Sequence, residues 1–102
     1  MDKKDLKYYI DDGKITILIK IPDHQPPHVH AFMKIKEEDV IYIQNQKRKN
    51  KPGHLPIDKF RLCQRWILEN QAQLLNTWAK LEQMGHIPKP VPVFKKNKFA
   101  LR

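Results

Sequence analysis

Apolar positions recur at every second residue in the first half of the chain. The clearest alternation covers residues 14–21 and puts one apolar face on Ile15, Ile17, Ile19 and Ile21. A sustained two-residue period is typical of a half-buried strand. Residues 6–10 form another β-prone run, and the Asp-Asp-Gly sequence at residues 11–13 favours a tight turn between the two runs. The pattern therefore predicts an N-terminal β-hairpin.

Two more β-prone runs follow a proline-rich connection at residues 22–27. Residues 28–36 alternate, so that one face carries Val29, Ala31, Met33 and Ile35 and the other carries His28, His30 and Phe32. Residues 40–43 form the last run, and the sequence Lys-Glu-Glu-Asp at residues 36–39 predicts a turn before it. Since short turns join neighbouring strands antiparallel, we expect an antiparallel meander.

The period changes to three and four in residues 57–84, which contain no Gly or Pro. The apolar stripe consists of Phe60, Cys63, Ile67, Leu74, Trp78 and Leu81, widened by Leu62, Trp66 and Leu75. This spacing predicts an amphipathic helical region. The stripe lapses at Asn70, so we expect two helices, at about 57–69 and 71–84, with one long helix as the alternative. Gly85 and the prolines after it favour termination there.

Together these elements predict one α+β domain over residues 1–87. Its small antiparallel sheet of three to four strands would pack on one long or two shorter helices. Residues 88–102 form a tail rich in proline and lysine.

The length of 102 residues excludes multidomain enzymes and large barrels. The chain holds no apolar run long enough to span a membrane, and its first residues do not resemble a secretory signal. With one cysteine, Cys63, there is no internal disulfide framework, and we expect a buried, inert thiol in a cytoplasmic protein.

The net charge of +9 is concentrated in the second half of the chain and in one loop. The loop at residues 47–51 carries Lys47, Arg48, Lys49 and Lys51, and the tail adds Lys95 and Lys96. Clustered cations bind phosphate backbones by releasing counterions, so nucleic acid is a plausible partner. The alternative is a solvated loop and a tail without a ligand.

The most unusual sequence is a histidine motif in which His24, His28 and His30 surround two prolines. On a strand, His28 and His30 would share the face opposite Val29 and Met33, away from the main core. Three imidazoles could bind a divalent metal ion. Alternatively, His28 and His30 could act as an acid–base pair on a phosphodiester, with His24 orienting them.

A purely structural role for the motif is the third possibility, with Asp23 capping a turn and a histidine bonding the backbone there. The motif offers no obvious carboxylate or tyrosine for a ribonuclease mechanism, which favours a non-catalytic interaction module.

Three blocks resemble, in order, the small bacterial family named domain of unknown function 4160. The blocks are Asp-His-Gln-Pro-Pro-His-Val-His-Ala at residues 23–31, Gly-His-Leu-Pro at residues 53–56, and a stretch from Trp66 to Trp78 that includes Gln-Leu-Leu-Asn-Thr-Trp. The resemblance covers about residues 13–84. It implies a component of toxin–antitoxin-like gene pairs, with a small antitoxin-like protein as partner, and it implies no particular reaction. We therefore expect a toxin–antitoxin-like protein that binds, or also cleaves, nucleic acid.

Overall fold

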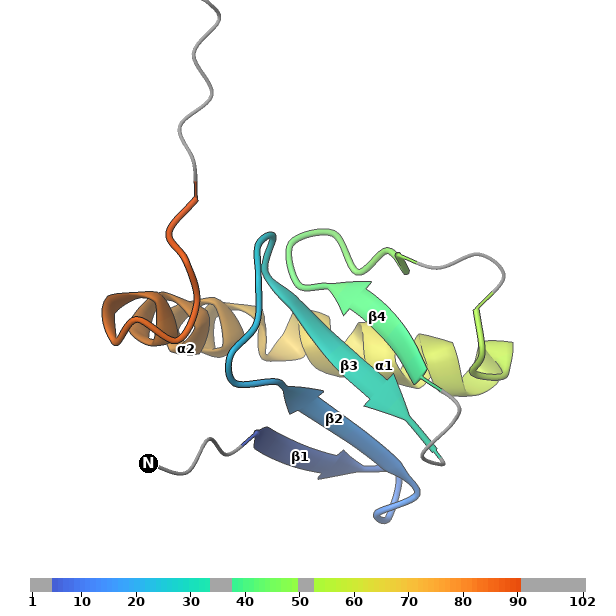
Figure 1. Ribbon diagram of the computed structural model, residues 1–102. Coiled ribbons are helices and arrows are strands. Elements are labelled where there is room, and N and C mark those ends of the chain that lie inside the picture. The colour runs from blue at the N-terminus through green and yellow to red at the C-terminus, as the bar shows by residue number, and fades with distance from the viewer. Residues whose placement is uncertain (1–4, 34–37, 50–52, 91–102) are drawn as a thin grey trace, which may run out of the picture.

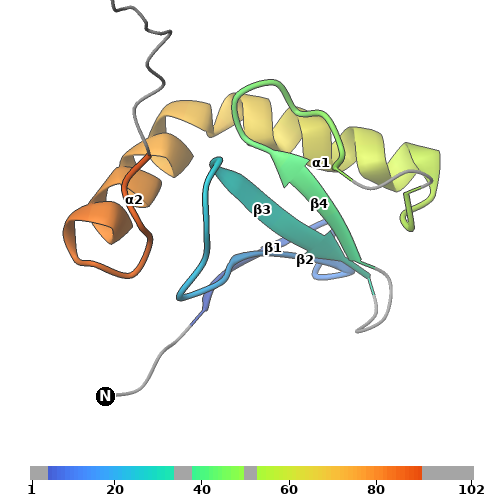
Figure 2. The same cartoon turned by 45° about the horizontal axis from the view of Figure 1, so that its top comes forward.

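The computed structural model describes residues 5–33, 38–49 and 53–90 (Figure 1). In chain order the elements are β1 (Leu6–Ile10), β2 (Ile15–Ile19), β3 (His28–Phe32), β4 (Glu38–Tyr42), α1 (Ile57–Glu69) and α2 (Gln71–Gln83). The strands form one antiparallel sheet in the order β1-β2-β3-β4. Both helices lie on the same side of the sheet (Figures 1 and 2). The predicted α+β arrangement is confirmed.

The first hairpin turns where the Asp-Asp-Gly sequence predicted. Asp11 and Asp12 have φ values of 56° and 55°, a left-handed conformation that Asp tolerates better than most residues. The amide of Gly13 donates to the carbonyl of Ile10 at 3.1 Å and closes the turn. Tight turn geometry fixes the register of β1 against β2, so the isoleucines of β2 face the helices.

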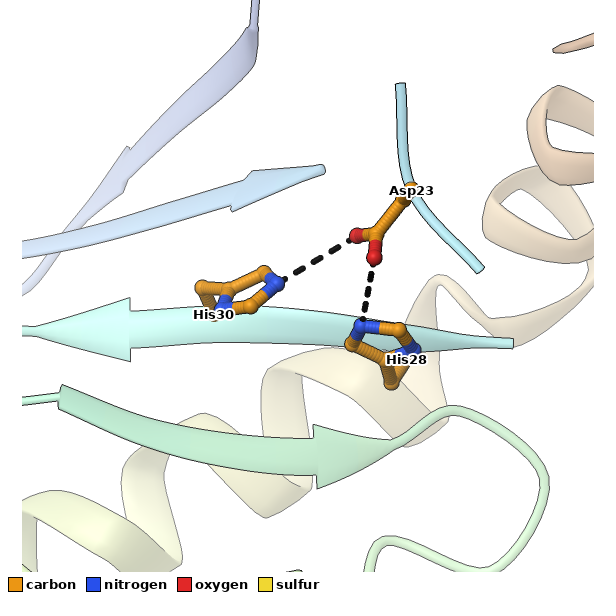
Figure 3. A group of neighbouring side chains, drawn as sticks. All are labelled: Asp23, His28 and His30. Atoms are coloured by element: carbon orange, nitrogen blue, oxygen red, sulfur yellow. Dashed lines mark hydrogen bonds and ion pairs between the residues drawn. The ribbon is translucent and has the colours of Figure 1, made fainter. Parts of the chain in front are cut away.

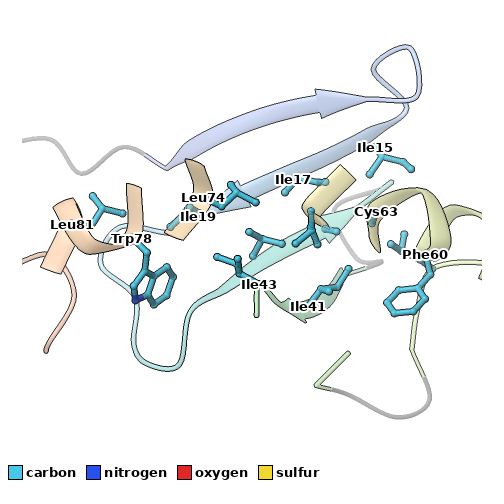
Figure 4. Packing of buried hydrophobic residues seen from close by; sticks show 14 of the residues in the cluster. Ile15, Ile17, Ile19, Ile41, Ile43, Phe60, Cys63, Leu74, Trp78 and Leu81 are labelled. Carbon is cyan, nitrogen blue, oxygen red and sulfur yellow. The ribbon is translucent and has the colours of Figure 1, made fainter. Parts of the chain in front are cut away.

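The core lies between the sheet and the helices (Figure 4). The sheet side of the core consists of residues from the strands and of the residue after β4, namely Ile15, Ile17, Ile19, Val29, Ala31, Ile41 and Ile43. The helices contribute Phe60, Cys63, Ile67, Leu74, Trp78 and Leu81. The residues of both predicted stripes therefore meet. Burying a side chain of this size stabilises the fold by roughly 1.5–3 kcal/mol.

The helical region is divided at Asn70, where the backbone has φ −113° and ψ 18°. The Asn70 side chain donates from Nδ2 to the carbonyl of Trp66 at 2.8 Å, and so satisfies an acceptor at the end of α1. The helix axis changes direction at this point (Figure 2). The lapse in the apolar stripe therefore marks a real boundary, and the alternative of one long helix is wrong. Gly85 follows α2 with φ 82°, as a residue ending a helix commonly does.

The boundaries around the β3–β4 connection differ from those predicted. Strand β3 ends at Phe32, and β4 begins at Glu38, so Asp39 belongs to a strand. Asp39 pairs with Ala31 and is fully buried on the helix-facing side. The prediction of an acidic turn through residue 39 was wrong at this position. The charge of Asp39 suggested solvent, whereas the loop before α1 supplies donors that compensate for its burial.

Cys63 lies inside the core, as expected. Burial, with smaller contributions from the charges of Asp39 and Asp11, raises the pKa of the Cys63 thiol to about 12. A thiol with that pKa stays protonated near neutrality and is a poor nucleophile.

Among the residues described here, no helix combines the length and the apolar character that crossing a bilayer requires.

Candidate functional site

The loop between β2 and β3 folds back over β3 and brings Asp23 to its two histidines (Figure 3). One carboxylate oxygen, Oδ1, lies 3.1 Å from Nε2 of His28. The other, Oδ2, lies 3.3 Å from Nε2 of His30. The amide of His24 also donates to Oδ1 at 2.8 Å, which orients the carboxylate locally. One aspartate thus bridges both imidazoles of the strand.

The two histidines share a face because β3 is a regular strand. His28 pairs with Tyr42 of β4, and His30 pairs with Leu18 of β2 and Val40 of β4. Val29, between them, enters the core on the opposite side. The predicted placement of both rings on one face, opposite Val29, is confirmed.

Both rings are more buried than the sequence suggested. The side chain of His28 is 2% exposed and that of His30 is 10% exposed. The ring of His28 lies 5.3 Å from the ring of Trp78, which belongs to α2. The two rings lie off the main core, as predicted, but the structure also buries them, with the ring of His28 against Trp78.

A second network, centred on Gln25, holds the loop against α2. Trp78 donates from Nε1 to Oε1 of Gln25 at 3.2 Å. Gln25 in turn donates from Nε2 to the carbonyl of Pro88 at 3.0 Å and to the carboxylate of Glu82. Sequence analysis did not single out Gln25; its position within the motif before the two prolines was the available signal. The loop is therefore fixed both to the sheet and to the end of the helical layer.

The electrostatics of Asp23 reflect its donors. Burial alone would raise the pKa of Asp23, but hydrogen bonds from His28, His30 and the His24 amide outweigh burial and hold the pKa well below its usual range. Asp23 is consequently a carboxylate at any ordinary pH.

Asp23 was missed as a member of the site, and the statement that the motif offers no carboxylate was wrong. Its signal was its place at the start of the histidine motif, where the sequence predicts that it caps a turn. The capping contact exists, since Asp23 accepts the His24 amide. However, the same carboxylate also reaches β3, which only the folding back of the loop reveals.

His24 lies beside the cluster rather than within it. Its side chain is 66% exposed, and its Nε2 is 3.9 Å from Oδ1 of Asp23. Its ring centroid lies 5.2 Å from that of His28. The group whose ligand atoms converge, all within 4.8 Å of one another, consists of Asp23, His28 and His30. The predicted metal set of His24, His28 and His30 is thus replaced in this geometry by one with a carboxylate.

In the basic loop, the side chain of Arg48 packs against the protein, whereas the side chains of Lys47 and Lys49 are exposed. Arg48 donates from Nη2 to Oδ2 of Asp39 at 2.9 Å, and its guanidinium lies 3.9 Å from the ring centroid of Phe60. Lys47 and Lys49 on either side are exposed. The remaining predicted nucleic-acid ligands, Lys51, Lys95 and Lys96, lie outside the described residues.

The Gly-His-Leu-Pro block completes the burial of Asp39. The amides of His54 and Leu55 donate to its carboxylate at 2.7 and 3.2 Å. A Cβ on Gly53 would lie 2.1 Å from Cζ of Arg48, so glycine gives the guanidinium room to reach Asp39. This block is therefore explained by packing around a buried ion pair.

Searches among curated proteins and among solved structures found no match to this chain. A family model described as "Domain of unknown function (DUF4160)" matches residues 14–79. The matched range contains the Asp23–His28–His30 cluster, the Gly-His-Leu-Pro block and α2 as far as Trp78. The resemblance carried by the three sequence blocks is therefore confirmed, and this chain belongs to the family of domain of unknown function 4160.

Proposed function

We propose that this protein is a non-catalytic nucleic-acid-binding component of a toxin–antitoxin-like pair. Its binding surface centres on the exposed lysines around Arg48. The overall charge of +9 supports an anionic partner. The role in a gene pair and the cytoplasmic location are part of the proposal and come from the sequence resemblance and the single cysteine.

The observation that carries the proposal is the anchoring of the loop by Arg48. Arg48 forms a bridge to Ile41, and the Lys49 amide donates to the carbonyl of Val40 at 2.7 Å. Lys47 and Lys49, on either side of the partly buried Arg48, are both exposed. Lys47 and Lys49 are therefore presented on a fixed backbone, which lowers the entropy cost of binding a phosphate backbone.

Binding without cleavage is the version that the histidine cluster supports. A general acid or base must come within hydrogen-bond reach of the substrate. His28 is almost fully buried, and Asp23 occupies the ring nitrogens of both histidines that face the loop. A polynucleotide would have to displace the loop that Gln25 fastens to α2.

The proposal is tested by reversing the charge of the two outward lysines. We expect the double variant Lys47→Glu/Lys49→Glu to weaken binding of a labelled mixed-sequence RNA or DNA by at least tenfold. The slope of log K against log salt should become shallower by about two, since each lost phosphate contact removes about 0.9 from it for a duplex.

Lys80→Glu, an exposed site on α2, is the control for charge alone. Fluorescence anisotropy at several salt concentrations measures both quantities. The proposal fails if the wild-type protein does not bind at about 50 mM salt, or if the double variant behaves like Lys80→Glu.

A protein-binding role is the second candidate, and the edge of the sheet supports it. Strand β1 is the terminal strand on one side, and Tyr9 on it is 64% exposed. An open edge can accept a strand from a partner. Replacing Tyr9 with Lys should then abolish co-purification with the product of the neighbouring gene while leaving RNA and DNA binding unchanged.

A further inference from the structure

We propose that Asp23, His28 and His30 bind one divalent transition-metal ion that fastens the β2–β3 loop to β3. This site is separate from the lysine surface proposed for nucleic acid. It also differs from the three-histidine set that the sequence motif suggested.

The first argument is the spacing of the ligand atoms. Zinc bonds of about 2.0–2.1 Å in a tetrahedral arrangement place neighbouring ligand atoms about 3.3–3.4 Å apart. Asp23 Oδ1 lies 3.1 Å from Nε2 of His28, and Asp23 Oδ2 lies 3.3 Å from Nε2 of His30. Each contact is close to one edge of such a tetrahedron, although the two contacts use different carboxylate oxygens, and the three ligand atoms lie within 4.8 Å of one another. Rotation of the side chains would bring one oxygen and both nitrogens around an ion.

The second argument is the hydrogen bonding of His28. Its Nδ1–H donates to the carbonyl of Pro26 at 2.7 Å. A metal-ligating histidine usually donates its other ring nitrogen in this way, which fixes the tautomer and turns the lone pair of Nε2 toward the ion. Here Nε2 faces Oδ1 of Asp23 at 3.1 Å, so the two atoms that would bind the ion already lie side by side.

A neutral His28 and an ionised Asp23 would place two acceptors 3.1 Å apart. Their contact becomes favourable only when a positive charge lies between them, either a second ring proton or a metal ion. A metal ion at this point would bind both atoms at once. The burial of all three side chains strengthens this requirement, because water cannot supply the missing donor.

The donor set defines the class of ion. Two imidazole nitrogens and one carboxylate oxygen suit zinc and neighbouring first-row ions, whereas calcium and magnesium prefer oxygen ligands alone. His24 lies beside the site, with its Nδ1 3.1 Å from the carbonyl oxygen of Gln25 and its Nε2 3.9 Å from Asp23 Oδ1.

Zinc titration of the purified full-length chain tests the proposal. Isothermal titration calorimetry against a competing chelator gives the affinity and stoichiometry, and cobalt substitution gives a visible spectrum that reports tetrahedral coordination. We expect one zinc per chain. Asp23→Asn keeps the shape of the side chain and removes the anionic ligand, and His30→Asn removes a ligand from the less buried ring. Each variant should weaken zinc binding by more than about 100-fold.

His86→Ala is the matched control, since it removes a histidine that lies after α2 and outside the cluster. It should bind zinc as the wild type does. Circular dichroism establishes that each variant is folded before its affinity is compared. A wild-type protein that takes up no zinc at about 100 µM overturns the proposal. So does a folded Asp23→Asn variant with unchanged affinity. Neither result bears on the lysine surface, whose test uses nucleic acid with a chelator present.

Discussion

Within the described part of the chain, the side chains of Asp39 and Asp23 are both buried, and different groups compensate their charges. Asp39 faces the helices, where it meets the guanidinium of Arg48 and the amides of His54 and Leu55. Asp23 lies on the other face of the sheet, where two imidazoles and one amide approach it. Both fasten a long connection to the sheet, but with different partners.

The partners of Asp39 are permanent donors. Arginine stays charged at every accessible pH, and backbone amides cannot lose their proton. The partners of Asp23 are the His24 amide and two imidazoles, and an imidazole, unlike a guanidinium, can also bind a metal ion. The connection held by Asp39 therefore rests on permanent donors, whereas the one held by Asp23 is the site of the metal ion proposed above. A buried carboxylate beside histidines is the better candidate for a metal site.

The largest expected effect follows from removing the permanent cation. Arg48→Met keeps the stem over Phe60 but leaves Asp39 as a buried charge without its counterion. Breaking a buried pair in this way costs about 3–5 kcal/mol of unfolding free energy. Urea denaturation at pH 7 measures it. Lys47→Met and Lys49→Met make the same charge change on exposed neighbours and should stay within about 0.5 kcal/mol of wild type. An equal loss of unfolding free energy in all three variants would contradict the ion pair between Arg48 and the buried Asp39.

His28→Ala should have the next largest effect. It removes a buried ring that contacts Trp78 and leaves acceptors of Asp23 and Pro26 without their donor. We expect a loss of about 2–3 kcal/mol, measured by thermal and urea unfolding with a chelator present. His24→Ala, from the exposed part of the same motif, should change the unfolding free energy by less than about 0.5 kcal/mol. A comparable loss in both variants would mean that the two rings are equally packed.

Asp23→Asn should have the smallest effect, and that effect should depend on pH. The folded-state pKa of Asp23 lies below its unfolded value, so its stabilisation is complete above about pH 4 and is lost as the pH falls through the folded-state pKa. At pH 7, without metal, we expect the variant to lose about 1–2 kcal/mol, since the hydrogen bonds lost are to a charged acceptor. The difference from wild type should shrink below pH 4.

The matched control for the pH series is Asp12→Asn, because Asn also tolerates the positive φ of the exposed turn. Its stability should follow the wild-type curve across the whole range. If the wild type and Asp23→Asn differ by a constant amount down to pH 2.5, hydrogen bonds to ionised Asp23 are not the source of the stabilisation.

The arrangement of strands and helices was predictable because it depends on local periodicity. The isoleucines of β2 recur at every second residue, and Phe60, Cys63 and Ile67 recur at helical spacing. The spacing within each element therefore predicts which of its faces is buried. The break at Asn70 also had a local signal. The common face of His28 and His30 followed from the same rule.

The partners of the charged residues could not be predicted in this way. Asp23 precedes a turn and Asp39 follows one, and both patterns are typical of solvated positions. Their burial depends on where two loops fold after the sheet and helices have assembled. The same is true of Arg48, whose neighbours Lys47 and Lys49 are exposed although all three look equivalent in the sequence.

The sequence by itself therefore determined the elements, their buried faces and the family to which the chain belongs. The tertiary structure decided which polar groups meet. Asp23 and His30 are seven residues apart, and Asp39 and Leu55 are sixteen apart. Periodicity describes neighbours within one element, whereas contacts across a loop are fixed by the cost of burying a charge without a partner, which is a property of the assembled fold.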